Sequence, residues 1–136
     1  MKLCNETITV ICSSLDEETG YDVYTPVVIS GCSWFAQVVT SVDAQSKLGG
    51  LKAATKVSIR IPEEAEVEDD REYVRPESYT DPATQWTLKV GDIVVRGAVR
   101  SASLSDIRAR TEHCTILGSV DNRRAPHAPH WRVTGS

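Results

Sequence analysis

Alternation of apolar and polar residues is the main structural signal in this chain. From Trp86 to Val90 every second residue is apolar and those between are polar, the two-residue period of a strand with one buried face. Gly91-Asp92 interrupts the pattern, and apolar residues resume at 93–95. Glycine tolerates the positive φ of a tight turn, and aspartate is a preferred turn residue beside it. The stretch 86–97 therefore predicts two strands, or one strongly bent strand, with Gly91 and Asp92 as the structural turn.

Further segments rich in β-branched residues show the same alternation and also predict strands. Ser30-Gly31 separates two of these strands as a bulge or turn. The strand that follows this bulge places Trp34, Ala36 and Val38 on one face. The segments occupy residues 7–12, 22–29, 32–40, 52–61, 114–118 and 131–134.

The segments between these strands contain few helical signals. Residues 41–50 are polar and predict a loop, and residues 63–82 form a long excursion without a sustained period. Residues 104–110 are the one stretch that predicts a short helix. No linker divides the chain, so residues 1–136 form a single domain. The fold class that follows is mainly β, a small barrel or sandwich of six to eight strands.

Composition narrows the possible partners. No apolar run is long enough to span a bilayer and no signal-peptide pattern opens the chain, so we expect a soluble protein that has no membrane partner. The net charge of −4 argues against a nucleic-acid binder that neutralises phosphates. The tryptophans lie among apolar neighbours, which favours core packing over base stacking.

The charges are unevenly distributed along the chain. The last third is rich in arginine, whereas one ten-residue segment is strongly acidic. Such a chain could stack head to tail with copies of itself or with a partner. The alternative is a solvated acidic loop with ordinary surface arginines, which is the commoner case for a lone protein. The acidic segment contains Glu63, Glu64, Glu66, Glu68, Asp69, Asp70 and Glu72.

No constellation predicts catalysis, a metal site or a cofactor. His113 and Cys114 are adjacent, so on a strand they point to opposite faces and cannot act as base and nucleophile. His127 and His130 lie in a loop that two prolines hold extended, which disfavours chelation. A thiol-dependent hydrolase is therefore the least favoured function. The cysteines, which have no CxxC spacing and are expected to be reduced, are Cys4, Cys12, Cys32 and Cys114.

The loop 121–131 is the best candidate for an interaction site. It combines two adjacent arginines with a tryptophan, a composition common in interface hot spots. Two prolines stiffen the loop, and this stiffness lowers the entropy lost on docking. We therefore predict a subunit interface formed by Arg123, Arg124, His127, His130 and Trp131.

Five segments carry a resemblance to a known family, namely residues 5–10, 28–35, 58–62, 86–97 and 116–131. They resemble an uncharacterised family of small structural proteins of tailed phages and prophages, which are encoded among capsid and head–tail connector genes. The resemblance covers nearly the whole chain. In addition, the Gly91-Asp92-Ile-Val-Val-Arg-Gly97 element is similar to the Gly-Asp hairpin of phage head-closure (stopper) proteins.

The resemblance implies a non-enzymatic virion protein of the neck, a head-closure or head–tail connector protein. Such a protein would form a homo-oligomeric ring between the portal-adaptor complex and the tail, after assembly in the cytoplasm of the host bacterium. DNA would pass through its channel without sequence-specific binding, and the acidic segment would face the lumen or a neighbouring ring. The alternative is a tail-completion or minor tail protein.

Overall fold

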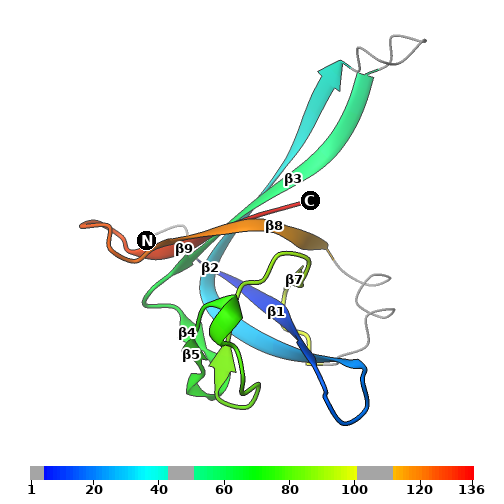
Figure 1. Ribbon diagram of the computed structural model, residues 1–136. Coiled ribbons are helices and arrows are strands. Elements are labelled where there is room, and N and C mark those ends of the chain that lie inside the picture. Colours follow the sequence, from blue (N-terminus) through cyan, green and yellow to red (C-terminus); the bar gives the residue numbers. More distant parts are fainter. Residues whose placement is uncertain (1–4, 43–50, 101–111) are drawn as a thin grey trace.

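Six antiparallel strands close into a barrel (Figure 1). The computed structural model describes residues 5–42, 51–100 and 112–136. The predicted mainly β fold is confirmed, in the form of a barrel with one additional strand. Around the barrel the strands follow the order β1 (Glu6–Leu15), β7 (Ile93–Arg96), β8 (His113–Asn122), β9 (His130–Gly135), β3 (Leu51–Pro62) and β2 (Asp22–Val42), and β2 pairs with β1 to close the ring.

Strand β2 is 21 residues long and belongs to two hairpins. Its first half pairs with β1, up to the pair Cys32↔Glu6, and its second half pairs with β3, from Ser33↔Arg60 onward. Gly31 lies between the halves with a φ of +87°, and the β1–β2 register shifts at the same place. The bulge predicted at Ser30-Gly31 is therefore present. The two strands predicted on either side of it form one strand, because the bulge bends the chain without ending it.

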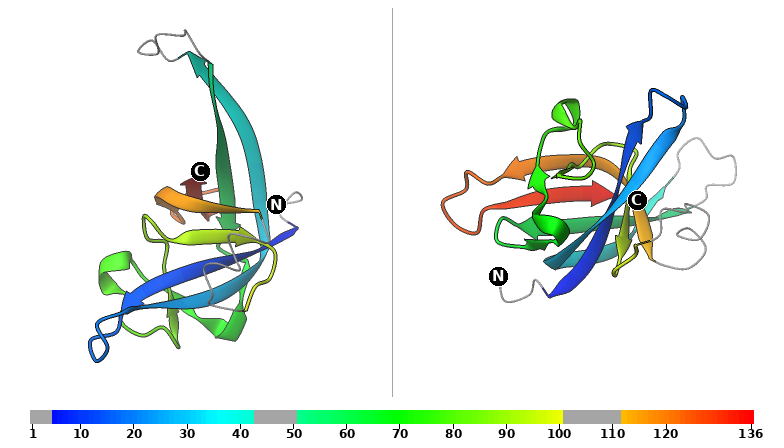
Figure 2. Two further views of the ribbon diagram at one scale, coloured as in Figure 1. Left: turned by 90° about the vertical axis from the view of Figure 1, so that its right-hand side faces the viewer. Right: turned by 90° about the horizontal axis from the view of Figure 1, so that it is seen from below.

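The β2–β3 hairpin continues beyond the barrel as a two-stranded arm, residues 36–42 and 51–56 (Figures 1 and 2). The last pair between β3 and β9 is Val57↔Gly135, so β9 supports β3 only up to this point. Part of the loop predicted at 41–50 is thus strand, and residues 43–50 lie outside the described residues.

The barrel core consists of apolar side chains from every strand of the ring. The cluster includes Ile8, Ile29, Ile59 and Trp86, all almost fully buried. Trp34 packs against the cluster from β2. Further cluster members are Val10, Cys12, Val27, Cys32, Val57, Ile61, Leu88, Val94, Cys114, Ile116, Trp131 and Val133. A second, smaller cluster is formed by Ile11, Ile93 and Val95.

The predicted long loop 63–82 is an excursion that contains four short elements and lies against the barrel (Figures 1 and 2). Its first strand pairs with β2 next to the bulge, through Ile29↔Val67 and Ser30↔Glu66. Its second strand runs parallel to β6 (Gln85–Trp86), through Tyr73↔Trp86. The four elements are β4 (Glu66–Val67), the 3₁₀ turn η1 (Glu68–Asp70), β5 (Glu72–Tyr73) and the 3₁₀ turn η2 (Pro76–Ser78).

The two strands and the turn predicted at 86–97 are present, but the two strands do not pair with each other as a hairpin. Gly91 has a φ of +95° and donates its N–H to the carbonyl of Ile116 at 2.9 Å. The segment before the turn pairs with β5, and the segment after it, β7, pairs with β1 and β8. The predicted alternation also ends early, because Thr87 is buried and Val90 is exposed. Pairing with the distant β5 overrides the local hairpin signal.

The short helix predicted at 104–110 lies outside the described residues. Within the described ranges no helix has the length and apolar composition needed to cross a bilayer.

Candidate interaction site

Three aromatic rings join the excursion to the barrel wall. Tyr73 comes from β5, Trp86 from β6 and Trp131 from β9, and their ring centroids are 4.9–5.1 Å apart. Two of the three contacts have the edge-to-face geometry that aromatic pairs prefer. Burial raises the pKa of the Tyr73 hydroxyl above its usual value of 10. The buried positions of Trp86 and Trp131 agree with the prediction that these tryptophans pack in the core.

Arg123, which follows β8, lies over two rings of this aromatic cluster and is held there by Asp121 of that strand. Its guanidinium carbon lies 4.9 Å from the ring centroid of Trp131 and 5.3 Å from that of Tyr73. The same guanidinium donates to both carboxylate oxygens of Asp121, with Nε–Oδ1 at 3.0 Å and Nη2–Oδ2 at 2.8 Å. This pairing lowers the pKa of Asp121 and raises that of Arg123. Arg123 therefore fixes the base of the loop.

The remainder of the loop points away from the barrel. We call residues 124–128 the loop tip; Arg124, Pro126, His127 and Ala128 are all exposed. Ala128 has a φ of +50°, so the tip is bent and not extended as the two prolines predicted. The sharp bend also brings His130 Nδ1 to 2.8 Å from the carbonyl oxygen of Ala128.

The five residues predicted as a subunit interface thus divide into two groups. Arg124 and His127 are on the surface of the loop tip, whereas Arg123, His130 and Trp131 have contacts within the chain. An interface with another subunit remains a prediction. Asp121 and Tyr73, the residues that hold Arg123, were not predicted from the sequence. The Asp-x-Arg spacing at 121–123 is the local signal that would have identified the first of them.

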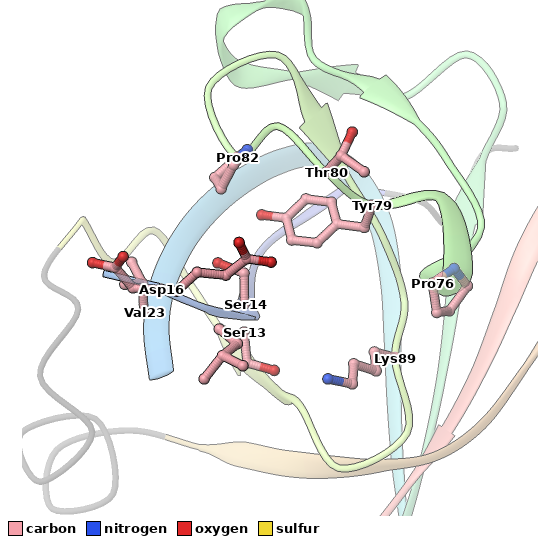
Figure 3. A pocket seen from close by; sticks show the side chains of 11 residues that line it. Ser13, Ser14, Asp16, Val23, Pro76, Tyr79, Thr80, Pro82 and Lys89 are labelled. Atoms are coloured by element: carbon pink, nitrogen blue, oxygen red, sulfur yellow. The ribbon is translucent and has the colours of Figure 1, made fainter. Parts of the chain in front are cut away.

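A hollow of about 590 Å³ lies between the β1–β2 hairpin and the excursion (Figure 3). Tyr79 extends across it toward the hairpin, and Pro76, Thr80, Pro82 and Lys89 complete the opposite side (Figure 3). The sequence gives no signal for this hollow because its walls come from three distant segments. The hairpin side consists of Ser13, Ser14, Leu15, Asp16, Glu17 and Val23.

Asp92 connects the predicted turn to the strand beside this hollow. Asp92 is 6% exposed. Its carboxylate accepts hydrogen bonds from the backbone N–H of Ser13 at 3.2 Å and from the Ser13 hydroxyl at 2.5 Å. Burial raises the pKa of Asp92, and the bonds from Ser13 oppose this effect. Burial also raises the pKa of Tyr79 to about 12. Asp92 therefore has a structural role, which joins the 91–92 turn to β1.

The seven acidic residues 63–72 are distributed along the excursion and partly paired. Asp69 lies 3.3 Å from Arg71, and Glu68 lies 3.2 Å from Arg100. Asp69 and Asp70 have φ values of +63° and +51°, a region that aspartate enters more readily than most residues. Among the residues with described positions, no group of three or more His, Cys, Asp or Glu side chains could hold a metal ion.

The described cysteines are buried in the barrel. Burial raises the pKa of Cys12 to about 12 and that of Cys114 to about 11. Both groups are therefore thiols, not thiolates, at neutral pH. The thiol of Cys114 lies in the core next to Gly135, where a substrate has no access.

These features define a small closed β-barrel with a projecting arm and an arginine loop held at its base. A family model described as a family of unknown function (DUF6751) matches residues 3–136, and the chain belongs to this family. Neither a curated protein nor a solved structure matches the chain.

Proposed function

We propose that this protein is a structural subunit of a tailed-phage virion, which forms a homo-oligomeric ring in the neck as a head-closure or head–tail connector protein. The resemblance of the sequence to phage structural proteins suggests this role. The arm is the structural observation that supports it most directly, because a projecting hairpin is a means of contacting a neighbouring subunit.

The arm carries apolar side chains that the barrel core does not cover. On β2, Ala36 and Val38 share the face of Trp34, yet Val38 is 66% exposed and Ala36 is also exposed. On the opposite face Phe35 is 63% exposed. Full burial of one such side chain contributes about 1.5–3 kcal/mol. A neighbouring subunit that covers the arm would gain this energy, whereas the isolated chain does not.

The edges of the arm provide a second reason to expect a neighbour. In the arm, β2 and β3 pair only with each other among the described strands. The outer edge of β3 loses β9 beyond Val57, and the outer edge of β2 loses β1 beyond Cys32. Unpaired strand edges are templates for pairing with another chain, and a two-stranded ribbon is marginally stable alone. The burial of Cys12 and Cys114 adds indirect support, since the thiol-hydrolase alternative requires an accessible thiolate.

The acidic segment is proposed to face the DNA channel or an adjacent ring. The acidic side chains at positions 63, 64, 66, 70 and 72 are exposed. Negative charge on a channel wall would repel the phosphate backbone and keep DNA from adhering.

The proposal is tested in the phage or prophage that encodes the chain. Mass spectrometry of purified particles should detect the protein, and electron microscopy of the neck should show it as a ring. Deletion of its gene should yield heads that fail to retain DNA and tails that remain unattached. Filled, stable heads with defective tails would instead assign the tail-completion role. Intact infectious particles that lack the protein would overturn both assignments.

A further inference from the structure

The loop tip and the hollow are far apart on one molecule and have complementary properties. In both Figure 1 and Figure 2 the β8–β9 loop projects on the side away from the β1–β2 hairpin, which forms one wall of the hollow. No residue of the loop tip lines the hollow of its own chain. Building on the proposed function, we propose that the loop tip of each copy seats in the hollow of the next copy and that this contact joins the subunits of the ring.

The loop tip is already organised for docking. Arg123 anchors its base through Asp121 and two aromatic rings, and Pro126 and Pro129 restrict the backbone that follows. An organised loop loses little conformational entropy when it binds. Within the described part of the chain the Arg124 side chain makes no hydrogen bond or ion pair, so it is available to a partner.

The hollow offers charge and surface of the matching kind. Asp16 and Glu17 lie on its hairpin side, whereas Lys89 is the one cation among its lining residues. The loop contains no acid from 122 to 130. The guanidinium of Arg124 would therefore be attracted to the hairpin side of the hollow and repelled from the side of Lys89.

Apolar surface in the hollow fits the rest of the tip. Leu15 is 65% exposed and Val23 is 42% exposed, and the ring of Tyr79 lies between two prolines in the lining. Grooves lined by aromatic side chains are favourable partners for proline-containing segments. The volume of about 590 Å³ lies within the range of sites that hold small ligands.

The geometry of the contact agrees with a ring. Donor and acceptor are different surfaces of one chain, so the contact is heterologous and leaves a free loop and a free hollow at the two ends of any open oligomer. Heterologous contacts of this kind close into rings when the rotation between the subunits permits.

Charge reversal of the full-length protein tests the contact. Sedimentation velocity over a range of concentrations should show that Arg124→Glu and Glu17→Lys each weaken self-association by about tenfold or more. The double variant should recover much of this loss. Lys89→Glu should strengthen association, since it removes the opposing charge. Glu18→Lys is the matched control, because Glu18 is in the same hairpin but outside the hollow, and it should leave association unchanged. Circular dichroism should show that all variants are folded.

Photocross-linking identifies the occupant of the hollow. A benzophenone side chain is placed at His127, and labelled and unlabelled copies are mixed so that links between copies are recognised by mass. Links to residues 13–17 or 76–82 of another copy are expected. The proposal would be overturned by links to any other surface, by links within a single copy, or by links from the loop to a different virion protein in particles. Charge reversals without effect would also overturn it. A ring that is visible in the neck despite such a result would leave the proposed function standing.

Discussion

The two halves of β2 are both paired strand, but the second half leaves the core after Trp34, whereas the first half stays over it. In the first half, Val27 and Ile29 are fully buried in the barrel. In the second half, Phe35 and Val38 are mostly exposed. The period of a strand determines which side chains share a face, whereas a second layer must be present for that face to be buried. Within the described part of the chain, no second layer covers Phe35 or Val38.

Alanine substitutions in the two halves should have very different costs. Ile29→Ala removes a fully buried side chain, and we expect it to lower the free energy of unfolding by about 2–5 kcal/mol. Val38→Ala, on the same strand, should change it by no more than about 0.5 kcal/mol. Urea unfolding of the monomer measures both. If the two costs were equal, the arm would have to be packed against its own barrel in solution.

Two glycines of the barrel wall, Gly118 on β8 and Gly135 on β9, provide the next comparison. A Cβ at Gly135 would lie 2.6 Å from the Sγ of Cys114 and 2.9 Å from the carbonyl oxygen of Thr115, whereas one at Gly118 would meet nothing within 4 Å. We expect Gly135→Ala to destabilise the fold by about 1–3 kcal/mol, because the backbone oxygen has little freedom to move. Gly118→Ala should have a much smaller effect. Thermal unfolding of the two variants, side by side, checks this. Equal melting temperatures would show that β8 and β9 pack less tightly than described.

A smaller effect is expected where the loop meets the barrel. Arg123→Lys keeps the charge but loses the two-pronged contact with Asp121 and the planar stacking on Tyr73 and Trp131. Because Arg123 is 40% exposed, solvent reduces the cost, and we expect a loss of about 0.5–1 kcal/mol. Arg124→Lys, at the neighbouring exposed position, is the control and should not change stability. Chemical denaturation gives the values, and shifts of the Trp131 indole resonance report loss of stacking. Equal behaviour of the two variants would contradict an anchoring role for Arg123.

The sequence predicted the strands well because local alternation records which face of each strand is apolar. It also located the bulge at Gly31 and the turn at Gly91, where backbone conformation requires glycine. It failed where a distant segment decides the pairing. Trp86 pairs with Tyr73 in a parallel bridge, although the residues next to it suggested a hairpin. No local pattern encodes such a choice.

The candidate site was predictable only in part, for the same reason. The composition of residues 121–131 singled out this loop as a candidate interface, but it treated both arginines as free donors. The fold places Asp121 and two rings around Arg123 and leaves Arg124 exposed. The hollow could not be predicted, since its lining residues range from Ser13 to Lys89 and meet only in the folded chain.

The smallest predicted effect compares a carboxylate of the barrel with one of the loop, through the pH dependence of stability. Burial raises the pKa of Asp92 in the folded state above its usual value of 3.8. Between pH 3.8 and this raised pKa, the folded state keeps a proton that the unfolded state has released. The stability of the folded state therefore falls as pH rises through this window. The pairing with Arg123 lowers the pKa of Asp121 below 3.8. The contribution of this pair to stability is therefore complete above pH 3.8, and it is lost as pH falls through the pKa of Asp121 in the folded state. As pH rises above 3.8, Asp92→Asn should therefore become more stable relative to the unmodified protein. As pH falls below 3.8, Asp121→Asn should lose less stability than the unmodified protein does. Urea midpoints measured from pH 2.5 to 7 resolve the two opposite slopes. Slopes of the same sign would mean that Asp92 is hydrated in solution and that the corner between β1 and β7 is more open than the buried pair with Ser13 implies.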